Sequence, residues 1–412
     1  MPPVIFRKGL DMKEAVASEL AAAYHSKIVD AVREGGFVRV SGRLTIHLAR
    51  EFGFCYGVDR AVDYAYQTRR QFPDRRVFLS GEIIHNPDVN RRLTDMGIEI
   101  LGDSHDPVER FKTVGSGDVV ILPAFGVSVP ELNHLKAKQC VLVDTTCGSV
   151  LNVWKKVNYY AKDGYTVIIH GKHHHEETRA TASQALTHKG GQYLCVRDVA
   201  ETERVCEFIR GTLSAADLMS KFGEASSADF DPEVHLQRIG LANQTTMLMS
   251  ETLKVQDTLR RAMIDRHGAD NLESRFRAFD TICSATQERQ DAVLEMLDAG
   301  GLDLMVVIGG YNSSNTQALA RMCAPRVTTY YVDSPECVTD AGIQHHLIGT
   351  PGESLAPAWL PAGDVRIGVT AGASTPDSVV GETIERILAL RGQTAADLTQ
   401  AADIAQGSQS YA

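Results

Sequence analysis

The most regular feature of the chain is an alternation of short apolar runs with longer amphipathic stretches. Seven runs rich in β-branched and aromatic residues have the length and composition of strands buried between helices. Between them, apolar residues recur at helical spacing, for example across 58–72 and 375–390. The pattern predicts an α/β fold of parallel sheets flanked by helices. We expect strands within 77–81, 118–126, 140–146, 165–171, 302–310, 327–334 and 365–372.

A repeated arrangement, in which one cysteine stands between a strand-like run and an amphipathic helix, predicts three consecutive α/β units. We expect these units to span residues 46–140, 141–275 and 276–391. Residues 1–45 are interpreted as a helical extension that mixes acidic and basic side chains, and residues 392–412 as an exposed tail. A segment near 214–236, rich in Ser, Ala and Asp, is predicted to be an inserted surface loop of the second unit.

Composition and charge indicate a soluble globular protein. Apolar residues make up 43% of the chain and charged residues 23%. The N-terminal stretch lacks the apolar core of a secretory signal, roughly 7–15 residues long, and no run of about 18 apolar residues predicts a membrane span. The formal charge of −10 argues against a nucleic-acid binder, because phosphate backbones favour clustered Lys and Arg. We therefore expect a cytoplasmic protein with neither nucleic-acid nor membrane partners.

Three of the eight cysteines share one position in the pattern. Cys55, Cys147 and Cys283 each stand between a strand-like run and the start of an amphipathic helix, one in each predicted unit. A helix N-terminus favours the thiolate form of cysteine, so three thiolates in such positions suit a soft metal or an iron-sulfur cluster. The alternative, an inert packing role, is easier to accept for one cysteine than for three in matching positions.

The remaining cysteines lack this context, and the chain contains no CxxC pair of the zinc-ribbon or thioredoxin kind. Three thiolates on a four-iron cube would leave one iron without a protein ligand, and an open site of this kind suits substrate chemistry. We interpret five cysteines as core residues, namely Cys140, Cys195, Cys206, Cys323 and Cys337.

Short polar side chains and histidines gather near the ends of the predicted strands. Taken singly, these segments contain ordinary helix N-caps. In open α/β folds, however, ligands bind beyond the carboxyl ends of strands, and helix N-termini with hydroxyl and amide donors accommodate phosphate. In the stretch HHHEE, residues 173–177, a carboxylate among imidazoles is a candidate proton source. The segments are 81–89, 170–181, 241–246, 310–319 and 370–377.

Over roughly residues 46–390, these segments resemble, in the same order, the family that reduces 4-hydroxy-3-methylbut-2-enyl diphosphate. The matching motifs are GFCYGVDRA, IIHNPDV, DTTC, HEET, QTT, DTICSATQERQ, GYNSSN and TAGASTPD. The N-terminal extension and the AFGVS segment resemble the longer cyanobacterial and plastid-type branch. The resemblance implies three α/β units in a pseudo-threefold trefoil around a central [4Fe-4S] cluster, which is held by Cys55, Cys147 and Cys283.

The resemblance also implies roles for further residues. Glu177 and Thr245 are the implied catalytic pair near the allylic hydroxyl of the substrate. The implied diphosphate ligands and pocket residues are His85, His175, Thr286, Ser313, Ser314, Asn315 and Ser374.

This chain departs from the family pattern at three positions. Many members have His where this chain has Phe125, so one expected imidazole contact to the diphosphate is missing here. Many also have Pro where this chain has Gly148 and Glu176, and the resemblance assigns no role to the extra carboxylate.

The implied reaction is the reductive removal of an allylic hydroxyl by two electrons and two protons, which gives isopentenyl and dimethylallyl diphosphates and water. The electrons are expected to come singly from ferredoxin or flavodoxin, because no GxGxxG dinucleotide motif is present. Two alternatives stay open. An iron-sulfur hydro-lyase acting on a small phosphorylated substrate would remove water without net reduction, and an iron-sulfur sensor or scaffold would have no use for the polar ligand set.

Overall fold

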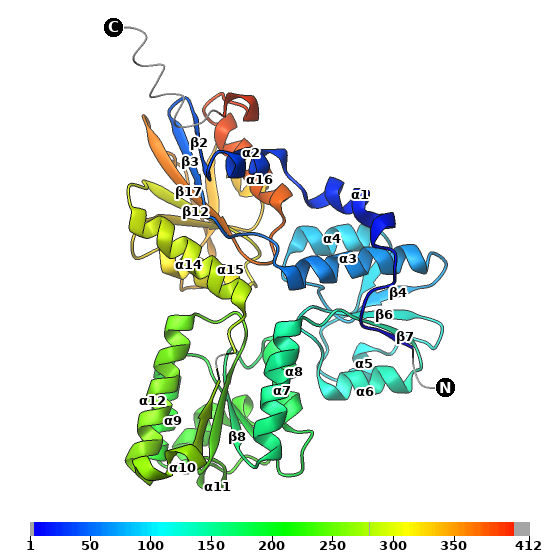
Figure 1. The fold of residues 1–412 in the computed structure, drawn as a ribbon, viewed down its shortest axis with the longest axis vertical. Helices are drawn as coiled ribbons and strands as arrows, with labels where there is room; N and C mark the ends of the chain where they lie inside the picture. The colour runs from blue at the N-terminus through cyan, green and yellow to red at the C-terminus, as the bar shows by residue number, and fades with distance from the viewer. Residues whose placement is uncertain (1–3, 280, 399–412) are drawn as a thin grey trace. The chain divides into compact units, whose positions relative to one another are not determined.

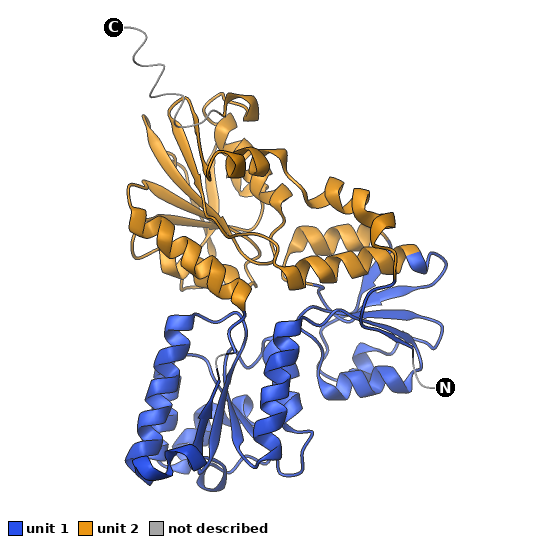
Figure 2. Cartoon of the chain, viewed as in Figure 1, with its two compact units in different colours: residues 1–10, 71–83, 97–283 blue, residues 11–70, 84–96, 284–412 orange. Residues whose placement is uncertain are grey.

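The computed structural model describes residues 4–279 and 281–398, and its strands and helices fall into two compact units (Figure 1, Figure 2). Both units combine segments from distant parts of the sequence. Unit 1 consists of the described parts of 1–10, 71–83 and 97–283. Unit 2 consists of the described parts of 11–70, 84–96 and 284–412.

The first sheet of unit 1 is parallel throughout. In spatial order its strands are β1 (Ile5–Phe6), β7 (Val141–Asp144), β6 (Val119–Leu122), β4 (Val77–Leu79) and β5 (Ile98–Ile100). The neighbouring helices are α5 (Pro107–Arg110) and α6 (Val129–Ala137), and a capping box between Ser128 and Glu131 starts α6. Phe78 and Leu142 of the sheet share one core with Leu135 of α6.

The second sheet of unit 1 is also parallel. Its strands, in spatial order, are β11 (Phe276–Ala278), β10 (Ile239–Asn243), β8 (Thr166–His170) and β9 (Tyr193–Val196). Helices lie on both faces (Figure 1). One face carries α7 (Gly148–Lys162) and α8 (Glu176–Ala185), and the other carries α9 (Val199–Ile209) and α12 (Met249–His267). A 3-10 turn (Ala269–Asn271) and α13 (Leu272–Arg275) lead into β11.

The segment near 214–236 is mostly helical, so the expectation of an inserted surface loop is wrong. It contains α10 (Ala215–Phe222), a 3-10 turn (Gly223–Ala225) and α11 (Pro232–His235). Ser214 and Asp231 cap the two helices by accepting bonds from main-chain amides. Leu218 and Phe222, one helical turn apart, are buried in the core of the second sheet.

Unit 2 contains the largest sheet of the described residues. Its strands run in the order β14 (Val338–Thr339), β15 (Gly342–His346), β13 (Thr328–Val332), β12 (Leu304–Ile308), β17 (Val365–Ala371), β3 (Leu44–Leu48) and β2 (Val38–Ser41), and β16 (Glu353–Ala356) pairs with β15. The central strands β13, β12, β17 and β3 are parallel, whereas the strands at both edges pair in antiparallel fashion.

Helices cover both faces of this sheet (Figure 1). Because successive strand residues point to opposite faces, Val307 packs with α14 (Ser284–Ala299) and α15 (Ser314–Cys323), and Val306 packs with α2 (Lys27–Glu34) and α16 (Asp377–Ala389). The other helices of unit 2 are α1 (Lys13–Tyr24), α3 (Tyr56–Gln71) and α4 (Pro87–Asp95), with 3-10 turns at Pro335–Cys337 and Ala395–Asp397.

The α/β class and all seven predicted strand regions are confirmed. The expected helical character of residues 1–45 holds for α1 and α2, but this segment also contains β1, which joins the first sheet of unit 1, and β2, which pairs with β3 in unit 2. The boundaries 46–140, 141–275 and 276–391 stay a prediction. Of the expected ends of the chain, residues 1–3 and 399–412 lie outside the described residues.

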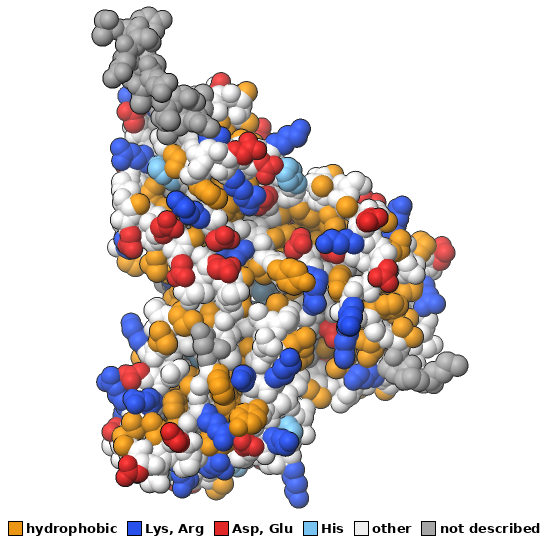
Figure 3. Space-filling model, in the orientation of Figure 1, with side chains coloured by type: hydrophobic (Ala, Val, Ile, Leu, Met, Phe, Trp, Pro, Cys, Tyr) orange, Lys and Arg blue, Asp and Glu red, His pale blue; other side chains and the backbone are white. Residues whose placement is uncertain are grey.

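No helix within 4–279 and 281–398 combines the length and the apolarity that crossing a membrane requires. Acidic and basic side chains are interspersed over the face in Figure 3. The expected lack of a nucleic-acid partner stays a prediction from the net charge of −10.

Candidate functional site

The three candidate cysteines lie at matching places in the three sheets. Cys147 is the N-cap of α7, and Cys55 and Cys283 immediately precede the first residues of α3 and α14. All three are partly exposed, whereas the five cysteines predicted to be core residues are buried, which confirms that prediction. Cys55 belongs to unit 2, and Cys147 and Cys283 belong to unit 1.

One hydrogen-bond pattern fixes the main chain at each of these cysteines. The amide of Cys147 donates to the carbonyl of Ala124 at 2.8 Å, that of Cys55 to Ala373 at 3.2 Å, and that of Cys283 to Thr245 at 3.3 Å. In every case the acceptor is the second residue after a strand, namely β6, β17 or β10. These strands are the parallel neighbours of β7, β3 and β11, which precede the cysteines. The three sheets therefore present their thiols in the same way.

Further bonds hold the loops that lead to the cysteines. Before Cys147, the Thr145 hydroxyl donates to the carbonyl of Leu122 at 2.6 Å. Before Cys283, the hydroxyl of Thr281 accepts bonds from the main-chain and side-chain amides of Asn243, at 2.8 and 2.9 Å. These contacts tie each loop to the end of the adjacent strand.

Burial changes the acidity of four of the five core cysteines. It raises the pKa of the Cys140 thiol to about 11 and the pKa values of Cys195, Cys206 and Cys323 to about 12, so these groups stay protonated at neutral pH. The candidate cysteines are partly exposed and stand at the N-terminal ends of helices. Three such donors fit an iron-sulfur cluster with one iron left open to substrate.

Glu177 and Thr245 are joined directly within unit 1. Glu177 lies in the first turn of α8 and is only 3% exposed. Its Oε1 accepts a bond of 2.6 Å from the Thr245 amide, and its own amide donates to Nδ1 of His175 at 3.2 Å. Because Nδ1 of His175 accepts this bond, the neutral ring carries its proton on Nε2. His175 can then donate that proton in a hydrogen bond to an anion.

Gln244 organises this region and was missed as an individual residue in the sequence. Its Oε1 accepts bonds from the amide of Lys172 and the hydroxyl of Thr178, both at 3.2 Å, and its Nε2 donates to Thr246 at 3.0 Å. It therefore links the loop before α8 to the loop after β10. The signal was present, because Gln244 opens the QTT motif that contains Thr245.

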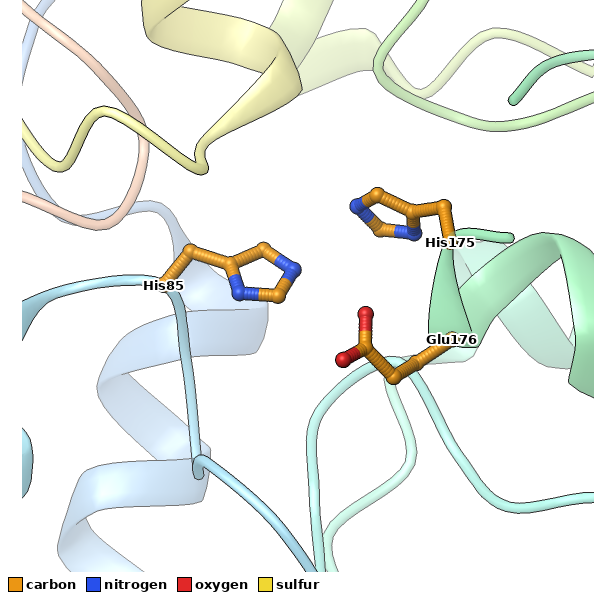
Figure 4. Close-up of side chains that lie close together, drawn as sticks. All are labelled: His85, His175 and Glu176. Atoms are coloured by element: carbon orange, nitrogen blue, oxygen red, sulfur yellow. The ribbon is translucent and has the colours of Figure 1, made fainter. Parts of the chain in front are cut away.

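Within the stretch 173–177, neighbouring side chains differ sharply in exposure. His173 and His174 are exposed, whereas His175 and Glu177 are buried. Glu176 is half-buried and lines a small enclosed cavity together with Phe125 and Arg110. Figure 4 shows the side chains of His175 and Glu176 leaving the start of α8, and that of His85 leaving the loop before α4.

Phe125 packs beside a predicted diphosphate ligand. Its ring is 9% exposed and meets the His175 ring edge-on, with centroids 6.3 Å apart and planes at 71°. The apolar ring therefore supports the position of the imidazole but offers no hydrogen-bond donor of its own.

In unit 2, the structure brings together most of the other predicted ligands. Nδ2 of Asn312 donates to Nδ1 of His85 at 3.3 Å, and the Ser374 hydroxyl donates to the carbonyl of His85 at 3.0 Å. Oδ1 of Asn315 accepts a bond of 2.9 Å from the amide of Ala373. The loops after β12 and β17 thus meet around His85. Asn312 was missed, although it lies within the GYNSSN motif.

Two serines and a threonine complete the predicted set. Ser313 is the N-cap of α15 and accepts a bond of 3.3 Å from the Thr316 amide, and Ser314 begins the helix. The N-terminus of α15 therefore lies beside the His85 loop, as expected of a phosphate site. Thr286, by contrast, is fully buried within α14. Its predicted place in the pocket wall stays untested.

Comparison with known proteins settles the family. Residues 46–388 match the LytB protein family. The chain belongs to this family. This chain is 46% identical, over 95% of its own length and 96% of the relative, to the 4-hydroxy-3-methylbut-2-enyl diphosphate reductase of Synechococcus sp. (strain RCC307). It is 44% identical, over 94% of each chain, to the reductase of the same name from Acaryochloris marina (strain MBIC 11017).

A solved structure agrees in fold with this chain. It is that of the E-1-hydroxy-2-methyl-but-2-enyl-4-diphosphate reductase from Plasmodium falciparum, with a TM-score of 0.61 at 22% identity, covering 83% of this chain and 87% of that one. The family resemblance seen in the sequence is therefore confirmed.

Proposed function

We propose that this chain is a 4-hydroxy-3-methylbut-2-enyl diphosphate reductase that produces isopentenyl and dimethylallyl diphosphates. The relatives that match almost its whole length carry this name. The structural observation that supports the proposal best is the chain of bonds from Glu177 through Thr245 to Cys283, because it joins a buried acid to a candidate cluster ligand. The substrate class is accordingly an allylic alcohol that carries a diphosphate.

The proposed cofactor is a [4Fe-4S] cluster held by Cys55, Cys147 and Cys283, with three α/β units arranged around it as a trefoil. When bound, the cluster supplies electrons and an iron site that is open to the substrate hydroxyl. The hydrogen bonds that the main-chain amides of the three cysteines donate hold the backbone at each cysteine before the cluster binds. This pre-organisation lowers the cost of ordering the ligands.

Glu177 is the proposed proton donor, because hydroxide leaves an allylic carbon poorly unless it departs as water. The Thr245 amide holds its carboxyl group through Oε1, and this carboxyl group is proposed to carry and deliver the proton. The Thr245 hydroxyl is proposed to pass this proton to the substrate oxygen. A second proton at either end of the allylic system gives the two products, and two electrons balance the loss of water.

The diphosphate is proposed to bind to two groups of donors. One is the His85 loop with the start of α15, where Ser313, Ser314 and Asn315 offer hydroxyl and amide groups near a helix N-terminus. Ser374 adds a hydroxyl from the loop after β17. The other donor is the Nε2–H group of His175.

The electrons are proposed to arrive singly, because the sequence contains no dinucleotide-binding motif of the GxGxxG kind that would bind a hydride donor. A small carrier such as ferredoxin or flavodoxin is the proposed donor, and the cytoplasm is the proposed compartment. Assays with purified carriers of both kinds distinguish them by the rate of cluster re-reduction.

Anaerobic purification with iron and sulfide counting tests the cofactor and the substrate together. We expect about four irons per chain and an electron paramagnetic resonance signal of the reduced protein that changes when the substrate is added. Inorganic diphosphate is the control, since it lacks the hydroxyl and should leave the signal nearly unchanged. A protein with zinc, or with an iron signal that ignores the substrate, would contradict the proposal.

A further inference from the structure

Arg289 is a buried cation that contacts main-chain carbonyls rather than carboxylates. It lies in the second turn of α14 and is only 3% exposed. Its Nε and Nη2 donate to the carbonyl of Gly53 at 3.1 and 2.7 Å, and Nη2 also donates to the carbonyl of Phe54 at 3.2 Å. Nη1 donates to the carbonyl of Ala285 at 2.8 Å. Among the described residues, no carboxylate forms an ion pair with it.

This arrangement fixes the loop that presents Cys55. The amide of Gly53 donates to the carbonyl of Ala371, and the amide of Cys55 donates to the carbonyl of Ala373. The guanidinium group of Arg289 donates to the carbonyls of Gly53 and Phe54 in the same loop. Gly53 has a φ of 72°, and a Cβ there would lie 3.1 Å from the carbonyl oxygen of Thr375. The loop is therefore held by specific bonds on both sides, and the position of Cys55 follows from them.

The charge of Arg289 calls for a nearby anion. A guanidinium keeps its proton in proteins, and burying a cation without an opposite charge is unfavourable. Carbonyl dipoles offset only part of this cost. The side chains that hold the other two cysteine loops carry no charge. They are Thr145 in one loop and the pair Asn243 and Thr281 in the other. Arg289 thus adds a full positive charge to the main-chain contacts at one cysteine loop.

We propose that Arg289 is a positioning residue that holds Cys55 for cluster binding and supplies a fixed positive charge that favours the reduced cluster. The inference rests on the proposed cofactor. Each electron that enters a thiolate-ligated cluster adds negative charge, and a fixed cation in a protein interior stabilises the more negative state. Removal of the charge should therefore make the cluster harder to reduce.

The test compares Arg289→Gln, Arg289→Lys and wild-type protein by iron content, midpoint potential and thermal unfolding of the cluster-free form. Arg50→Gln is the matched control. Arg50 lies in the same loop as Gly53 and pairs with Glu295 of α14, but its side chain is 68% exposed, so water screens its charge. Iron counting on the wild type separates a failure of the cofactor proposal from a failure of the role of Arg289.

We expect Arg289→Gln to lower the equilibrium constant for one-electron reduction about tenfold, which equals about 59 mV. Arg289→Lys keeps the charge and should stay near the wild-type potential, as should Arg50→Gln. Loss of iron from Arg289→Gln with normal unfolding of the cluster-free protein would also support the positioning role. An unchanged potential with full iron in Arg289→Gln would overturn the proposal. Failure of the cluster-free Arg289→Gln protein to fold would overturn it too, because the charge would then serve stability.

Discussion

The main-chain amide of Thr245 donates to Oε1 of Glu177 at 2.6 Å, while the carbonyl of the same residue accepts a bond from the amide of Cys283. A single residue thus connects the candidate acid with a candidate cluster ligand inside unit 1. The two groups come from the start of α8 and the start of α14, and the loop after β10 sets their relative position.

Glu177→Gln should keep the fold and the cluster but lose most of kcat. The amide oxygen of Gln can still accept the Thr245 bond, whereas the transferable proton is gone. General-acid catalysis is worth about 10²–10⁴-fold, which sets the expected loss in turnover. Glu176→Gln is the control, because Glu176 is the adjacent carboxylate, is half-buried and has no proposed role as the acid. Equal kcat values for the two variants would contradict the assignment of Glu177 as the general acid.

Cys55→Ser, Cys147→Ser and Cys283→Ser should each fail to retain the cluster, because a serine hydroxyl is a poor substitute for a thiolate ligand of iron. Cys323→Ser is the control, since Cys323 is buried in the core between α14 and α15. It should keep its iron even if its melting temperature falls. Iron and sulfide are counted after anaerobic purification, and full iron in any of the first three variants would refute that ligand.

Thr281→Val should loosen the loop that carries Cys283. The variant leaves both amide groups of the buried Asn243 without their acceptor, which costs about 1–3 kcal/mol. Chemical unfolding measures the loss, and iron release to a chelator should be faster. Thr187→Val is the comparison, because its hydroxyl bonds are exposed and far less should change. Similar stability of both variants would count against this clamp.

Phe125→His should keep the fold and lower the KM for the diphosphate substrate severalfold. The imidazole takes up less space than the phenyl ring and adds a hydrogen-bond donor beside His175. Phe125→Leu is the control, since it removes the ring contact without adding a donor, and its KM should not fall. A variant Phe125→His that cannot fold would show that the ring serves only as packing.

The fold class followed from the sequence because parallel strands buried on both faces leave continuous apolar runs. The segment 214–236 was misjudged from its Ser and Asp content. The same residues include Ser214 three positions before Asp217, which is the spacing of a helix start, and Leu218 and Phe222 at helical spacing. The strand β1 was missed because a strand of two residues is too short to form a recognisable apolar run.

The sequence predicted those parts of the site that residue types and local motifs indicate, but not the contacts between distant segments. The helix-start positions of the three cysteines were visible in the sequence, since a strand-like run precedes each one. The contact between Arg289 and Gly53 was not visible, because it joins residues that are far apart in the chain. The same holds for the bond between Asn312 and His85. Such pairings arise from the order of strands within a sheet, which local patterns do not determine.

Anaerobic turnover of 4-hydroxy-3-methylbut-2-enyl diphosphate, with and without a one-electron reductant, is the most direct measurement of the proposed activity. We expect isopentenyl and dimethylallyl diphosphates to form only when reductant is present, with two electrons consumed for each molecule of product. Products that appear at the same rate without reductant, or a substrate that loses water with no electrons consumed, would contradict the proposal and indicate a hydro-lyase.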